Sequence, residues 1–102
     1  MARRSKAAVK DDVTHFYLIK HTAKGTVQGA AQKKKAVNDV TKVVRKEGGH
    51  CQLYSTRGGV FDYVSVMTGL TTAAAVRIVA EIEKRGTVNA TLLPGTMTFD
   101  SR

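Results

Sequence analysis

The chain has one cysteine and one proline among its 102 residues, and each scarcity argues against a class of protein. The lone Cys51 cannot form an intrachain disulfide or a cysteine metal cluster, so the sequence predicts a cytoplasmic protein in a reducing compartment. One proline and a hydrophobic content of 42% argue against a disordered chain. The apolar runs are only a few residues long, so we expect no membrane span, which needs about 20 apolar residues.

Acidic residues are also scarce: the chain has 8 acidic and 17 basic residues, so its net charge is +9. Such a balance favours weak binding of polyanions. Residues 1–12 are highly charged and show no hydrophobic periodicity, so they are predicted to form a disordered basic leader. The leader carries the cations Arg3, Arg4, Lys6 and Lys10. We expect a solvated basic surface, with weak polyanion binding through this tail.

Residues 13–102 are predicted to form a single domain with the element order β-α-β-β-α-β. Strands are expected at residues 13–20, 49–56, 60–67 and 87–93, and helices at residues 30–47 and 72–85, with Thr71 or Thr72 as the cap of the second helix. Residues 21–29 are expected to be a loop, and Pro94 is expected to stop the last strand. Residues 96–102 either extend along a sheet edge or fray. This order predicts a ferredoxin-like α+β fold, a four-stranded antiparallel sheet with two helices on one face.

The hairpin in the middle of the chain carries a family resemblance. Gly58 and Gly59 supply the positive φ angles that a tight turn needs, and Phe61 and Asp62 follow them. This hairpin resembles the GYD domain family, which is named for a glycine, an aromatic residue and an aspartate at this place. Residues 22–27 are similar to the family's stretch after its first strand. The resemblance implies a ferredoxin-like fold related to dimeric α+β barrels, and it implies no particular activity. Phe61 departs from the family's usual tyrosine.

Strand alternation sorts the side chains onto two faces of the sheet. The face under the helices is expected to carry Phe16, Leu18, Cys51, Leu53, Val60, Val64, Val66, Val88, Ala90 and Leu92. The open face is expected to carry His15, Tyr17, Ile19, His50, Gln52, Tyr54, Phe61, Tyr63, Ser65, Met67, Asn89, Thr91 and Leu93. Such a face would leave a large apolar patch in water. We therefore expect a homodimer or higher homo-oligomer that buries the open face.

The candidate ligand or interface residues all belong to this open face: His15, Tyr17, His50, Tyr54, Phe61, Tyr63 and Met67. Tyrosine and histidine suit a surface that is partly buried and partly wet. The first interpretation is a non-enzymatic module that oligomerises or binds a small ligand, and we choose it here. The alternative is a cofactor-independent enzyme of the dimeric α+β-barrel type, with a cleft between subunits. A nucleic-acid binder would also show aromatic residues on an open sheet, but the basic residues concentrate elsewhere.

Asp62 is expected on the face covered by the helices, among valines, and it has two interpretations. A buried carboxylate in a cleft is a catalytic candidate, whereas an aspartate near a strand start often accepts backbone N–H bonds and pins a loop. We favour pinning, with residues 21–29 as the partner.

The histidines and the glycines predict neither a metal site nor a cofactor site. His15, His21 and His50 lack a convergent spacing, so we expect no metal site. The glycines lack the spacing of a nucleotide-binding loop, so we expect no cofactor. Cys51 is expected in the core.

Overall fold

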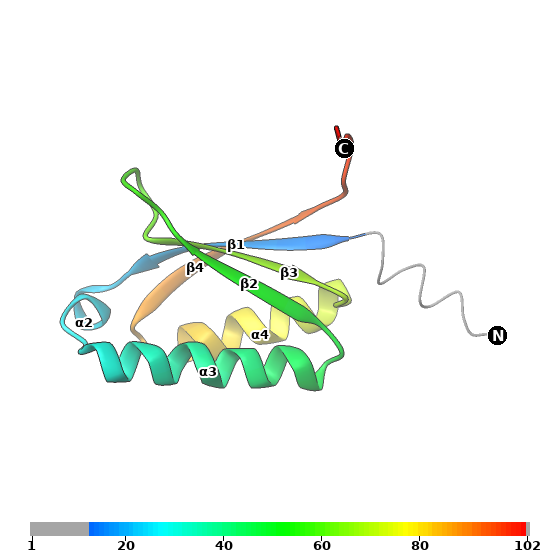
Figure 1. The fold of residues 1–102 in the computed structure, drawn as a ribbon. Helices are drawn as coiled ribbons and strands as arrows, with labels where there is room; N and C mark the ends of the chain where they lie inside the picture. The colour runs from blue at the N-terminus through cyan, green and yellow to red at the C-terminus, as the bar shows by residue number, and fades with distance from the viewer. Residues whose placement is uncertain (1–12, 102) are drawn as a thin grey trace.

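The computed structural model describes residues 13–101 and shows the ferredoxin-like α+β fold that the sequence predicts (Figure 1). Its elements are β1 (Thr14–His21), α2 (Ala23–Thr26), α3 (Ala30–Lys46), β2 (His50–Ser55), β3 (Tyr63–Thr68), α4 (Thr72–Lys84) and β4 (Val88–Gly95). The predicted leader, residues 1–12, lies outside the described residues. Its disorder and its binding of polyanions stay predictions.

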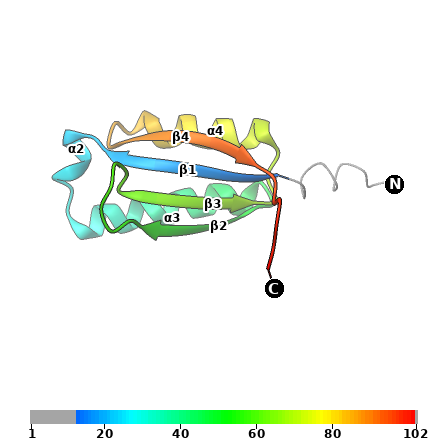
Figure 2. The same cartoon turned by 90° about the horizontal axis from the view of Figure 1, so that it is seen from above.

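The sheet is antiparallel throughout, with the strand order β2-β3-β1-β4. Figure 2 shows β2 and β4 at opposite edges, with β3 and β1 between them. Both long helices, α3 and α4, lie on one side of the sheet, and the other side carries no helix (Figure 1). We call these two sides the helix face and the open face.

In the inner strands β1 and β3, the helices cover the opposite face from the one that the sequence predicts. His15 and Tyr17 of β1 are fully buried and Met67 of β3 is 1% exposed, because all three lie on the helix face. Phe16 and Leu18 therefore lie on the open face, where they pair across from Val66 and Val64. The outer strands follow the prediction: Cys51, Leu53, Val88, Ala90 and Leu92 lie on the helix face, and His50, Gln52, Tyr54, Asn89, Thr91 and Leu93 lie on the open face.

Hydrogen bonds to α4 show why β1 has this orientation. The Tyr17 hydroxyl donates to the Ala75 carbonyl oxygen at 2.6 Å, and His15 Nε2 lies 3.1 Å from Thr72 Oγ1. Both faces of β1 carry large side chains, so apolar alternation alone does not determine which one is covered. The Tyr17 hydroxyl and His15 Nε2 favour this orientation, since both find a partner on α4 when buried, while His15 Nδ1 has no partner among the described residues.

The helix α4 supplies four of the nine buried hydrophobic residues that form the core of the described chain. Its buried residues Ala74, Ala75, Ile78 and Ile82 recur at the spacing of one helical face. The cap is the one predicted, because Thr71 Oγ1 accepts from the backbone N–H of Ala74 at 3.1 Å.

The hairpin loop between β2 and β3 is longer than predicted, because Ser55 pairs with Tyr63 and residues 56–62 form the connection. Gly58 and Gly59 have φ angles of 108° and 92°, which suit glycine. The Thr56 backbone N–H donates to the Asp62 carbonyl oxygen at 3.0 Å and closes the loop. The Thr56 hydroxyl donates to the Phe61 carbonyl oxygen. Val60, Phe61 and Asp62 thus belong to the loop and not to a strand.

Residues 21–29 are only in part the loop that the sequence predicts, since His21 ends β1 and Ala23–Thr26 forms the short helix α2. Thr22 Oγ1 accepts from the backbone N–H of Gly25 at 3.2 Å and caps this turn. Gly25 is buried against the chain before β4, and a Cβ placed on it would lie 1.9 Å from the Thr87 carbonyl oxygen. Only glycine allows this close approach.

The edge strand β4 continues through Pro94, which pairs with His15, so the prediction that Pro94 ends the strand is wrong. Proline is compatible with an edge strand because its missing N–H can face outward. Four residues earlier, the Ala90 N–H donates to Glu83 Oε2 at 3.0 Å.

The chain after β4 leaves the sheet on its open side (Figure 1). Met97 and Phe99 in this segment are 72% and 82% exposed. Within residues 13–101, no helix has the length and apolar character needed to cross a membrane.

Candidate functional site

The helix α3 packs closely on the sheet at one end only. Val44, near its C-terminus, is fully buried, whereas Val37 is 42% exposed although it lies on the same side of the helix. Gly49 follows α3 and lies against Leu70, since a Cβ on it would be 2.6 Å from Leu70 Cδ2. This contact holds the C-terminal end of α3 down. The N-terminal half stands off the sheet and leaves a hollow beneath it.

The hollow is a partly open cavity of about 240 Å³ between α3 and the helix face of the sheet. Aliphatic and aromatic side chains dominate its walls. From the sheet come Tyr17, Ile19, His21, Cys51, Leu53, Tyr63, Ser65, Met67 and Val88. From α2–α3 and α4 with its following turn come Gln28, Lys33, Lys34, Ala36, Val37, Val40, Thr41, Ile82, Arg85 and Thr87. Concave, mostly apolar cavities with few polar groups are typical of small-molecule sites.

A histidine and a tyrosine form the main protic pair of this cavity. His21 Nε2 and the Tyr63 hydroxyl share a hydrogen bond at 3.3 Å, and the two rings meet edge to face with centroids 5.2 Å apart. His21 Nδ1 is buried and has no hydrogen-bond partner among the described residues. The Tyr63 hydroxyl therefore accepts from or donates to Nε2 according to the tautomer of the ring.

The Tyr17 hydroxyl is not available for chemistry in the cavity. Its ring lines the wall, but its oxygen points to α4 and donates to Ala75. Burial also raises the pKa of the Tyr17 phenol above its ordinary value, so it stays protonated. Tyr17 is a structural residue, and this leaves Tyr63 as the tyrosine hydroxyl that the cavity offers.

The predicted site residues separate into four places. Tyr17, Tyr63 and Met67 line the cavity, and their predicted place on the open face is wrong. His15 was also predicted on the open face but lies buried against α4. His50 and Tyr54 lie on the open face of the edge strand β2, as predicted, and Phe61 lies in the hairpin loop.

Several residues that line the cavity lie outside the predicted site. His21 was weighed only as a metal ligand, yet it continues the alternation of His15, Tyr17 and Ile19 and thus faces the helices. Cys51 was expected in the core, but it is half-buried and lines the cavity, with Sγ 3.8 Å from Thr41 Oγ1.

Cations surround the cavity and carboxylates do not. Lys33, Lys34 and Arg85 are among its lining residues, and no aspartate or glutamate is. Arg85 Nη2 is already held by Asp39 Oδ2 at 3.3 Å. The same carboxylate also accepts from Lys35 at 3.0 Å, and these contacts hold the pKa of Asp39 below its ordinary value. The cavity therefore lies in a positive environment.

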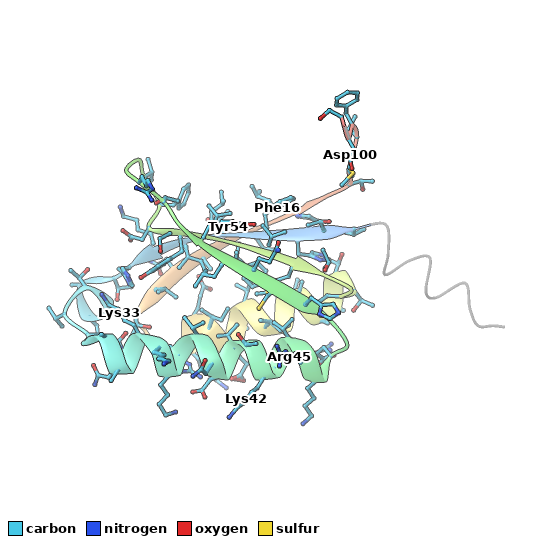
Figure 3. The ribbon with its side chains drawn as sticks, in the orientation of Figure 1. Phe16, Lys33, Lys42, Arg45, Tyr54 and Asp100 are labelled. Atoms are coloured by element: carbon cyan, nitrogen blue, oxygen red, sulfur yellow. The ribbon has the colours of Figure 1, made fainter. Side chains whose placement is uncertain are left out.

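The open face is the second candidate surface. Phe16 points to the side away from the helices, and Tyr54 lies on the same side (Figure 3). Leu93 and Tyr54 are 47% and 54% exposed, and Phe16, Leu18, Val64 and Val66 lie between them. The apolar open face that the sequence predicts is present, although the inner strands supply different residues.

The residues that the structure describes contain no group of three histidine, cysteine, aspartate or glutamate side chains arranged to hold a metal ion.

Solved structures of several proteins share this fold, among them SnoaB, MhuD and a chlorite dismutase-like protein. SnoaB, a cofactor-independent oxygenase from Streptomyces nogalater, matches with a TM-score of 0.64 at 14% identity, over 89% of this chain and 97% of SnoaB. A variant of MhuD with two manganese protoporphyrin IX molecules per active site matches with a TM-score of 0.56 at 16% identity, over 88% of this chain and 98% of MhuD. A chlorite dismutase-like protein matches with a TM-score of 0.64 at 14% identity, over 88% of this chain.

The last match covers 46% of the chlorite dismutase-like protein, so this chain spans less than half of it. No family model and no curated protein matches the chain. At such identities the likeness shows a common fold, here the α+β architecture that SnoaB and MhuD share. The resemblance to the GYD family stays a prediction.

Proposed function

We infer that the cavity under α3 binds a small, mostly apolar molecule and that the protein acts on it as a cofactor-independent enzyme. The observation that carries this proposal is the His21–Tyr63 pair on the wall of an apolar cavity. Apolar walls supply binding, and a histidine with an adjacent phenol supplies a place where a proton can be taken or returned. SnoaB, a cofactor-independent oxygenase, has the same fold and so supports the enzyme interpretation by analogy.

The size of the cavity limits the ligand. Pockets for drug-sized molecules usually measure roughly 300 to 1,000 Å³, and this one measures about 240 Å³. A molecule of one or two rings fits such a volume. The proposed ligand is therefore smaller than the porphyrins that the MhuD variant holds.

Each half of the pair has a defined task in the proposed reaction. His21 Nε2 accepts a proton from the bound molecule, and the Tyr63 hydroxyl, which then accepts from the protonated Nε2, donates its own hydrogen to the negative charge left on that molecule. His21 later returns the proton to the product. His21 stands at the end of β1, where its backbone N–H is fixed by Asp62. The ring is thus positioned by the fold and not by the ligand.

A second copy of the chain is proposed to cover the open face. Phe16, Leu18, Val64, Val66 and Leu93 would otherwise keep a continuous apolar patch in water. The cavity lies on the other side of the sheet, so dimerisation through the open face leaves it accessible. The site is then built within each subunit and not between subunits.

A non-enzymatic binding module is the second candidate function. It is favoured by the small number of protic groups in the cavity and by the structural use of the Tyr17 hydroxyl. A binding module would form the same dimer and use the same ligand site as the enzyme. The two candidate functions differ only in whether the protein converts the bound molecule.

Native mass spectrometry of protein isolated from its own host tests both candidates. We expect a retained small molecule in the parent protein, and a ligand-free protein would contradict the binding proposal. Val40→Phe fills the cavity and should remove the bound mass, whereas Val76→Phe changes a residue that is 52% exposed on α4 and should not.

Incubating the released compound with fresh protein then tests turnover. Conversion by the parent, reduced about a hundredfold in Tyr63→Phe, supports the enzyme. A compound that the parent binds and leaves unchanged supports the module instead.

A further inference from the structure

We propose that the ligand of this cavity carries one anionic group, a carboxylate, phenolate or enolate, and that Lys33 is its counter-ion. The inference rests on the proposed function, because it names the chemical class of the molecule that the cavity binds. It starts from the position of Lys33 on α3.

Lys33 occupies an inward position of α3. It precedes Val37, Val40 and Val44 by four, seven and eleven residues, the spacing that keeps side chains on one side of a helix. Figure 3 shows Lys33 on the side of α3 that faces the sheet and Lys42 on the side that faces away. Lys33 is half-buried and lines the cavity. A lysine thus stands where the pattern of the helix calls for an apolar residue.

The charge of Lys33 is not neutralised within the part of the chain that the structure describes. The ion pairs there join Lys35 and Arg85 to Asp39, Arg77 to Glu47 and Lys84 to Glu81. None of them involves Lys33, and the cavity wall contains no carboxylate. A partly buried lysine without an ion pair gains most from an anion that approaches through the same apolar space.

The other cations at the cavity are less suited to this task. Arg85 is occupied by Asp39, and Lys34 is exposed on the flank of the helix. Lys33 alone combines an inward position, partial burial and freedom from an ion pair. A flat apolar molecule would lie against Tyr63 and Met67, with its anionic group at the N-terminal end of α3.

A matched pair of probes tests the proposal: 2-naphthoate, which is anionic, and 2-naphthamide, which is neutral and has nearly the same shape. Binding is followed by amide chemical shifts in the ¹⁵N-labelled protein, which also report the place of binding. We expect both probes to shift cavity residues and the parent to bind 2-naphthoate about three to ten times more tightly.

Two variants with the same change of charge separate Lys33 from the general positive field. Lys33→Met should abolish the preference for 2-naphthoate and keep the binding of 2-naphthamide. Lys42→Met lies on the outer side of α3 and should keep the preference. Methionine and lysine have similar helix propensities, so both variants should fold.

The outcomes test the binding function of the cavity and the role of Lys33 separately. If neither probe shifts cavity residues, the proposed binding function fails. If both bind the parent equally, or if Lys33→Met keeps the preference, the binding function stands and the role of Lys33 is overturned.

Discussion

Asp62 Oδ2 accepts a hydrogen bond from the backbone N–H of His21 at 2.8 Å. The backbone of Asp62 also donates to the Ile19 carbonyl oxygen at 2.8 Å. One residue of the hairpin loop thus holds the end of β1, where His21 turns toward the cavity. The sequence predicts this pinning of the segment after β1, but it places Asp62 wrongly on the helix face, since the side chain is exposed in the loop.

Asp62→Asn should lower the free energy of unfolding by roughly 1 to 2 kcal/mol at neutral pH, because the amide keeps an acceptor but loses the charge assistance. Urea melts measure the difference. Glu81→Gln removes a surface carboxylate whose partner Lys84 is 3.5 Å away, and it should change the stability by less than about 0.5 kcal/mol. An Asp62→Asn protein as stable as the parent would overturn the pinning role and make Asp62 a candidate for function.

Gly25→Ala should destabilise the protein by about 2 to 4 kcal/mol. The added Cβ would lie 1.9 Å from the Thr87 carbonyl oxygen and 3.1 Å from His21 Nδ1, so the α2 turn must move away from β4. Gly29→Ala is the control, since a Cβ there meets nothing within 4 Å. It should cost less than about 1 kcal/mol. Equal melting temperatures for the two variants would contradict the close packing of Gly25.

Light scattering should show a dimer at micromolar concentration and not the 11.0 kDa monomer. Leu93→Asp places a charge on the open face at a residue that is 47% exposed, so it should dissociate the dimer and leave the circular dichroism of the fold unchanged. Val60→Asp changes a hairpin-loop residue that is 68% exposed and should leave the dimer intact. A monomeric parent protein would end the proposal.

The stability of the fold should fall as the pH decreases below about 6.5. Burial lowers the pKa of His15 from its ordinary value of 6.5, so the folded state keeps this ring neutral. Between these two pKa values the unfolded chain binds a proton that the folded chain does not, and the free energy of unfolding decreases. At higher pH this contribution is fully present.

Urea melts from pH 8 to pH 5 measure this dependence. His15→Gln should flatten the profile below pH 6.5, whereas His50→Gln replaces an exposed histidine and should leave its slope unchanged. A His15→Gln profile parallel to that of the parent would contradict the assignment to His15.

The order and type of the long elements could be predicted from the sequence because each has its own local signal. The spacing of Val37, Val40 and Val44 indicates α3, and Thr71 marks the start of α4. The short helix α2 was missed because a single capped turn has no apolar period. The length of the hairpin loop was missed because residues 60–62 continue the β-rich composition of the strand.

The candidate site could not be predicted because it depends on which face of β1 and β3 the helices cover. The apolar character of the β3 valines predicted that they lie under the helices, which is wrong. Tyr63 and Ser65 lie there instead, and these polar residues suit the helix face only when a cavity exists there. That cavity comes from the distance of α3 from the sheet, which no local pattern encodes. Lys33 was the available signal, a charge in phase with three valines.

The outer edge of β4 limits how copies of this protein can associate. Its hydrogen-bonding groups alternate in direction, so the Ala90 N–H and the ring nitrogen of Pro94 face the same way. The Ala90 N–H already donates to Glu83, and the Pro94 nitrogen has no hydrogen to donate. The edge of β4 therefore offers an added strand fewer backbone donors than an unbroken edge would. In the proposed dimer each subunit uses its one open face on the other, so this contact closes after a single pairing, and higher concentration should yield more dimers without growth through the β4 edge.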